Sequence, residues 1–202
     1  MSDELHETED VSVSRLEAFS DGVIAIIITI MVLELKPPHD SSAIALLDLW
    51  PTFFSYTLSF LIVAIYWVNH RHVVRYATRV SPALLWTNML VLFTISLIPF
   101  ATAWLGDHLD SRAPNMVYGG VLIAGAISFL LFCEIVYRQN KEHVEFQDAI
   151  RTARIKGVLT LLIYTLGMAL GEIAPGAVFV AAGVAALMYF APSYISKKRV
   201  SR

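Results

Sequence analysis

Hydrophobic residues occupy six long blocks of the chain, and short polar stretches separate them. The blocks cover roughly 16–35, 46–70, 83–105, 116–138, 155–172 and 176–195. A helix needs about 20 mostly apolar residues to cross the hydrocarbon core of a bilayer, and each block approaches or exceeds that length. The pattern therefore predicts an all-α integral membrane protein with six transmembrane helices.

Composition agrees with this pattern and limits the number of domains. The 202 residues are 56% hydrophobic and only 16% charged, whereas about a quarter of the residues in a soluble domain are charged. We expect one transmembrane domain over 15–195. An acidic, poorly ordered cytoplasmic arm over 1–14 would precede it, and a basic cytoplasmic tail over 196–202 would follow it.

Lysine and arginine residues orient the predicted helices. Of the fifteen, thirteen fall on the side that holds both termini and the expected loops 71–82 and 138–156, and only Lys36 and Arg112 fall on the other. The positive-inside rule places the basic side in the cytoplasm. We therefore expect cytoplasmic termini and a multi-pass protein of the cell membrane. The same rule explains the basic loops of a chain with net charge -2, so we expect no nucleic-acid partner.

Three of the predicted helices bring polar side chains to one layer near the cytoplasmic face. These are Ser20 and Asp21, Asn69 and His70, and Trp86 and Asn88. Polar groups inside a membrane normally face the interior of a bundle and pair with each other. One interpretation is a structural staple in which Asp21 bonds to His70 or Trp86. The other is that the layer lines a hydrated route.

Arg15 and Asp21 lie six residues apart in the first predicted helix, so their side chains point about 120° apart. They cannot pair along one helix face, and we expect each to reach a different neighbouring helix. Further along this helix, Ile26, Ile30 and Leu33 form an apolar stripe with Thr29 on its flank. The spacing alone favours packing over a pore lining.

Specific motifs over 15–106 resemble the endolysosomal potassium channel family (transmembrane protein 175 family). "RLEAFSDG" at 15–22 is similar to its Arg-x-x-x-Phe-Ser-Asp-Gly signature, and "AIIITIMVLEL" resembles the pore half of its first helix. "YWVNHRH" is similar to its second-helix Trp-x-x-His segment, and "LLWTNMLVLF" with "LIPFATAWLG" to its third helix. One position departs from the family: Arg71 stands where a second histidine is common. The match is to short prokaryotic members with one six-helix unit.

The resemblance implies a homotetramer with four first helices around a central pore. It implies a potassium-selective cation channel without a Thr-Val-Gly-Tyr-Gly filter, and no such filter occurs in this sequence. By motif position, the pore constriction falls on Ile26, Ile30 and Leu33, and potassium preference on Thr29. The family's structural polar network falls on Arg15, Phe19, Ser20, Asp21, Gly22, His70 and Trp86, and Gly22 resembles a site of close helix approach.

Two other functions stay open at this point. A small proton-linked secondary transporter could use Asp21 and His70 as a relay, although the broken spans and inverted repeat of such carriers are not evident. An accessory membrane subunit without transport is the second. No Ser-His-acid arrangement, glycine-rich phosphate loop or pair of cysteines occurs. We therefore expect no enzyme activity, cofactor or structural metal, and potassium ions, lipid and copies of the chain as the only partners.

Overall fold

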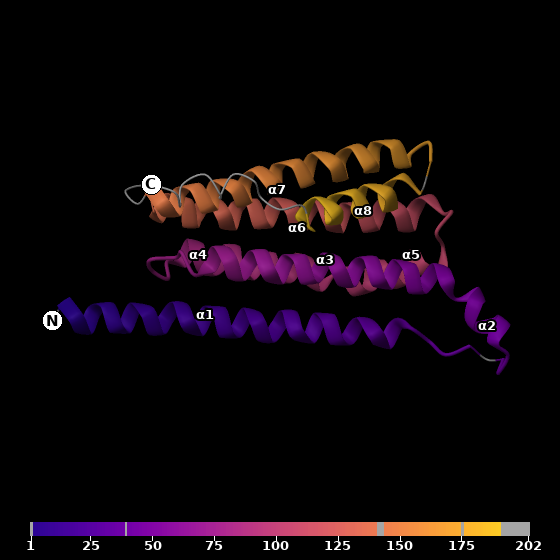
Figure 1. The fold of residues 1–202 in the computed structure, drawn as a ribbon, viewed down its shortest axis with the longest axis horizontal. Helices are drawn as coiled ribbons and strands as arrows, with labels where there is room; N and C mark the ends of the chain where they lie inside the picture. Colours follow the sequence, from indigo (N-terminus) through magenta and orange to yellow (C-terminus); the bar gives the residue numbers. More distant parts are fainter. Residues whose placement is uncertain (1, 39, 141–143, 175, 191–202) are drawn as a thin grey trace, which may run out of the picture.

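The computed structural model describes residues 2–38, 40–140, 144–174 and 176–190, and its long helices lie side by side along one axis (Figure 1). The first helix, α1, covers Ser2–Ile30, and a 3-10 turn, η1, continues it over Met31–Glu34. The acidic segment 1–14 was expected to be poorly ordered, but the helix begins at Ser2. Acidic side chains are favourable in the first turns of a helix because they complement its positive N-terminal dipole.

The second predicted span is preceded by a short helix. Helix α2 covers Ala43–Asp48, and the side chain of Ser42 caps it by accepting a hydrogen bond from the backbone of Ala45. Helix α3 follows over Trp50–Val74 with a proline in its first turn, where the missing N–H costs nothing. At about 1.5 Å per residue, α3 is long enough to cross a bilayer.

The third predicted span consists of two helices with a break between them. Helix α4 covers Pro82–Ser96 and α5 covers Ile98–Asp107. Pro99 lies just beyond the break at Leu97. Its ring removes a backbone donor and clashes with the carbonyl four residues earlier, which accounts for the interruption. The two helices still follow one another along the bundle (Figure 1).

The C-terminal part contains α6 over Arg112–Gln139, α7 over Val144–Gly171 and α8 over Ala177–Phe190. The expected loop 138–156 is wrong, because α7 begins at Val144 and only residues 140–143 separate the two helices. The start of α7 is amphipathic: Ile150 and Ala153 are buried while Arg151 is exposed. A helix can therefore continue through polar sequence beyond the membrane. Residues 191–195 of the last predicted span, and the basic tail, lie outside the described residues.

Five helical segments are long and apolar enough to cross a membrane, with the broken third span counted as one. They are Val13–Glu34, Trp50–Val74, Pro82–Asp107, Arg112–Gln139 and Gln147–Gly171. Helix α8 is apolar but shorter. The protein is thus an all-α membrane protein with five to six spanning helices, as the hydrophobic pattern predicted.

The bundle has α1 along one side, α3 with α4 and α5 in the middle, and α6 to α8 on the other side (Figure 1). Helix α1 packs against α3 and α4. Polar side chains join the central helices, since Tyr118 on α6 hydrogen-bonds Ser59 on α3 and Thr102 on α5 donates to the same serine. These contacts hold in place the helices against which α1 packs.

Candidate functional site

Helix α1 presents one face to its own chain and leaves the other uncovered. Ile24, Ile27 and Met31 are buried against the bundle, and Ile24 has 0% of its surface exposed. The apolar stripe points the other way, with exposed fractions of 58% for Ile26, 44% for Ile30 and 72% for Leu33. The stripe therefore does not pack within the chain, contrary to what its spacing alone suggested.

An open apolar groove runs along α1 beside the stripe. Ile26 and Ile30 form one wall, Pro99 and Phe100 of α5 form the other, and Glu34 lies at its outer end. The groove continues the uncovered face of α1 onto the third span. Both surfaces are available to lipid or to another protein chain.

Thr29 is exposed next to the stripe, and its own helix satisfies its hydroxyl. Its Oγ1 lies 3.0 Å from the carbonyl oxygen of Ala25 and 2.9 Å from that of Ile26. A hydroxyl that donates to the backbone keeps lone pairs that can accept or coordinate. Thr29 thus offers a fixed oxygen on the uncovered face.

Asn88 is the centre of the polar layer and joins α1, α3 and α4. Its Nδ2 donates to Ser20 Oγ over 3.0 Å, and its Oδ1 lies 2.7 Å from His70 Nε2. Since Oδ1 accepts, the hydrogen of His70 lies on Nε2. All three side chains have no exposed surface. Two helices are therefore tied to a third through a single amide.

The rest of His70 is enclosed by aromatic and apolar side chains. Its ring stacks on Phe132 of α6 with centroids 4.9 Å apart. Its Nδ1 is buried without a hydrogen-bond partner among the described residues. The histidine thus makes one polar contact, to Asn88, and otherwise packs as an aromatic ring.

Asp21 makes a separate link between α1 and α3. The indole Nε1 of Trp67 donates to its Oδ1 over 2.8 Å. The expected partners, His70 and Trp86, do not contact it: His70 bonds Asn88, and Trp86 is 76% exposed. Trp67 lies three residues before His70 on α3, so both project toward α1. The sequence placed these groups at one depth but did not identify Trp67 and Asn88 as the partners.

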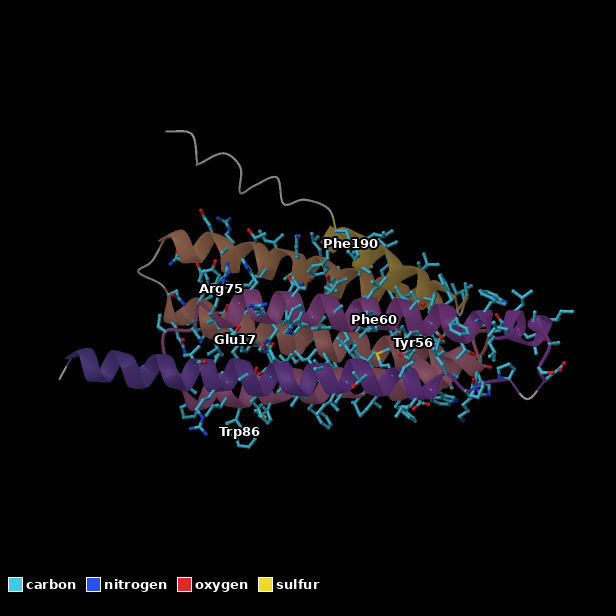
Figure 2. The ribbon with its side chains drawn as sticks, turned by 60° about the horizontal axis from the view of Figure 1, so that its bottom comes forward. Glu17, Tyr56, Phe60, Arg75, Trp86 and Phe190 are labelled. Atoms are coloured by element: carbon cyan, nitrogen blue, oxygen red, sulfur yellow. The ribbon has the colours of Figure 1, made fainter. Side chains whose placement is uncertain are left out.

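Arg71, which departs from the family pattern, gives a third contact between the same helices. Its Nε lies 3.7 Å from Glu17 Oε1, and its guanidinium lies 5.7 Å from the centre of the Trp67 ring. The arginine is mostly exposed, so solvent screens this pair and it contributes little stability. Glu17 faces the bundle from α1 in Figure 2.

Four of the expected network residues lie on the surface of the chain. Arg15 is exposed, Phe19 is half exposed, and Trp86 projects away from the bundle (Figure 2). A Cβ atom on Gly22 would meet no heavy atom within 4 Å. Any close approach at Gly22 must therefore involve another molecule.

Chemistry of other kinds finds no support in the described residues. No group of three or more histidine, cysteine or acidic side chains in that part of the chain could hold a metal ion. The three ionisable groups of the polar layer are engaged in helix contacts, with Glu17 on Arg71, Asp21 on Trp67 and His70 on Asn88. The uncovered face of α1 is the feature that needs a function.

Comparisons with known proteins agree on one family. The model of the endosomal/lysosomal potassium channel TMEM175 matches residues 15–99. A potassium channel from Chryseobacterium sp. (strain P1-3) is 43% identical over 155 residues, which cover 77% of this chain and 80% of that protein. One from Streptomyces collinus is 36% identical over 185 residues, 87% of this chain and 90% of that protein.

A solved structure extends the likeness to the fold. The crystal structure of a lysosomal potassium-selective channel TMEM175 homolog from Chamaesiphon minutus superposes with a TM-score of 0.69 at 30% sequence identity. The match covers 89% of this chain and 98% of that one. It therefore includes the C-terminal helices, for which the sequence gave only a matching number and length.

Proposed function

We propose, since the chain belongs to the TMEM175 family of potassium channels, that it is a potassium-permeable cation channel whose pore is lined by α1. The observation that carries the proposal is the two-sided burial of this helix. Its inner face is sealed against α3 and α4, while the stripe of Ile26, Ile30 and Leu33 is left uncovered. Membership of an ion channel family also means that the protein is not an enzyme.

The pore in this proposal forms in a homotetramer. Four copies of α1 around one axis would turn each stripe position into a ring of four branched apolar side chains. Such a ring cannot replace the water shell of an ion, and when narrow it expels water, so the pore closes by dewetting. The exposed surface of Gly22 and Trp86 supports assembly, because both lie where another copy could pack.

Potassium preference in this proposal involves Thr29. It is the polar side chain among the uncovered residues at the middle of α1, and its hydroxyl is held in place by two backbone carbonyls. Four such oxygens near the axis would help a partly dehydrated cation between two apolar rings. No Thr-Val-Gly-Tyr-Gly filter is present to do this instead.

The polar layer has a structural role in this proposal. The bonds from Asn88 to Ser20 and His70, and from Trp67 to Asp21, fix the rotation of α1 about its own axis. A rotation of one residue, about 100°, would move the stripe off the pore. The layer therefore acts on conduction by orienting the rings rather than by contacting ions.

The proposed location is the cell membrane with both termini in the cytoplasm. The basic residues support this orientation through the positive-inside rule. The N-terminus and the turn between α3 and α4 lie at the same end of the bundle, opposite α2 (Figure 1). This arrangement matches an even number of crossings between the two termini.

The proton-linked transporter has no observation in its favour. A relay needs Asp21 and His70 to exchange a proton, but each is bonded to a different side chain. Purified full-length protein in potassium-loaded liposomes separates the two functions. A channel gives passive potassium flux that follows the membrane potential and needs no proton gradient. Saturable flux that requires a proton gradient would refute the proposal, as would no flux from correctly assembled protein.

A further inference from the structure

A closed cavity lies in the bundle on the far side of α3 from α1. It is bordered by α3, α6, α7 and α8, and its volume is about 20 Å³. Apolar residues form most of the wall, but hydroxyl groups also face it, from Tyr66 on α3, Thr160 and Tyr164 on α7 and Tyr189 on α8. Polar groups from three helices therefore converge on one small internal space.

Two of these hydroxyl groups have no partner in the described part of the chain. Tyr66 and Tyr164 are buried side chains, and neither oxygen has a hydrogen bond to a described residue. By contrast, Thr160 donates to the hydroxyl of Tyr189 over 3.3 Å. Tyrosine hydroxyls that are buried usually find a hydrogen-bond partner, so the two unpartnered groups need an explanation.

The position of Tyr66 is built into the packing around it. Its ring meets Phe129 edge-on with centroids 6.1 Å apart. Its hydroxyl oxygen lies where a Cβ on Gly125 would come within 2.6 Å of it, so the glycine at that position makes room for the oxygen. The hydroxyl thus cannot move toward α6 for a partner, and the cavity is the open direction.

We propose that the cavity holds one ordered water molecule that bridges the hydroxyl groups of Tyr66 and Tyr164. A cavity needs about 10–15 Å³ of such volume to hold a water, and the water needs two to four polar partners. This cavity meets the first requirement, and the two tyrosines meet the second, with Tyr189 as a further partner. The occupant is a water molecule because the volume admits nothing larger.

The water would tie α3 to α7, which no described hydrogen bond does directly. Tyr66 lies one turn before His70, and the two rings contact Phe129 and Phe132, one turn apart on α6. A helix α3 held at Tyr66 also holds His70 against Asn88. The bridge would therefore support the polar layer from the opposite side of α3.

The sign of a stability change tests the proposal. We expect Tyr66→Phe and Tyr164→Phe, each in the full-length protein in detergent, to lower the unfolding midpoint by about 2–4 °C. The double variant should lose little more than the larger single loss, because either change already removes the bridge. If the cavity is empty, each single change removes an unsatisfied hydroxyl, so the midpoint stays the same or rises. That result would overturn the proposal.

Two further variants guard against other causes. Tyr118→Phe removes a hydroxyl that bonds Ser59 directly, outside the cavity, and its loss should add to that of Tyr66→Phe. Ala186→Val places extra carbons in the cavity and should lower the midpoint by displacing the water. Stabilisation by Ala186→Val, or additive losses from Tyr66→Phe and Tyr164→Phe, would contradict a bridging water. A high-resolution structure should show density about 2.7–2.8 Å from both oxygens.

Discussion

The same substitution at two positions of α1 separates the pore from the packing. We expect Ile30→Asn to raise potassium flux, because it places four amides in an apolar ring and lets water back into the constriction. Ile24→Asn, six residues earlier, should not raise flux. Ile30 is on the uncovered face and Ile24 is fully buried against the bundle, so the pair differs in the face it occupies and not in chemistry.

The burial of the two positions sets the magnitude of the effect on stability. Removing the Ile24 side chain forfeits about 1.5–3 kcal/mol of apolar burial, and a buried amide without partners costs a further ~1–3 kcal/mol. We therefore expect Ile24→Asn to lose about 3–6 kcal/mol. Ile30→Asn removes a side chain that is 44% exposed within the chain, and its effect on the fold of one chain should stay within about 1 kcal/mol.

The assay measures both quantities on the same preparations. Thermal unfolding in detergent gives the stability of each variant, and potassium efflux from liposomes at a fixed protein-to-lipid ratio gives the flux. Ile28→Asn, at a partly buried position off the stripe, is a second control. A higher flux from Ile24→Asn or Ile28→Asn, with none from Ile30→Asn, would mean that the pore-lining face is misassigned. No change from any variant of a conducting protein would mean that α1 does not line the pore.

Three other substitutions test the remaining roles. Asn88→Leu should lower the free energy of unfolding by about 2–4 kcal/mol because it leaves the buried His70 N–H unpaired; a loss below about 0.5 kcal/mol in denaturant titration would remove Asn88 as the hub of the layer. Arg15→Ala should weaken the tetramer without destabilising the single chain, since Arg15 is exposed, and unchanged mass by size-exclusion with light scattering would contradict this. Thr29→Val should lower the potassium-to-sodium permeability ratio by about fivefold, equivalent to ~1 kcal/mol, and an unshifted reversal potential in mixed-ion recordings would exclude Thr29 from selectivity.

The spans were predictable because the bilayer imposes one requirement on every crossing segment. A lipid-facing backbone must satisfy its own hydrogen bonds over a fixed thickness, so long apolar blocks become helices. Outside the bilayer this constraint ends. The start of α7 is polar, and its helix follows from the alternation of buried Ile150 and exposed Arg151, a pattern that hydrophobicity alone does not detect.

The polar layer was predictable in depth but not in pairing. Distance from the helix ends placed Ser20, Asp21 and His70 near one plane. The partner of each group depends on how α1 and α3 are rotated, and a change of one residue turns a side chain by about 100°. That rotation comes from packing around buried residues such as Ile24, so the bond between Asp21 and Trp67 became evident only in three dimensions.

The half-covered state of α1 has a consequence for how the protein is made. Lipid chains are as apolar as isoleucine, so a newly inserted chain pays little for its uncovered stripe. Each chain can therefore complete its own polar bonds, from Asn88 and Trp67, before it meets a second one. Assembly would then be a separate step that depends on the density of chains in the membrane. Cells that express the gene weakly would hold folded but silent single chains, and conduction would rise more steeply than the amount of protein.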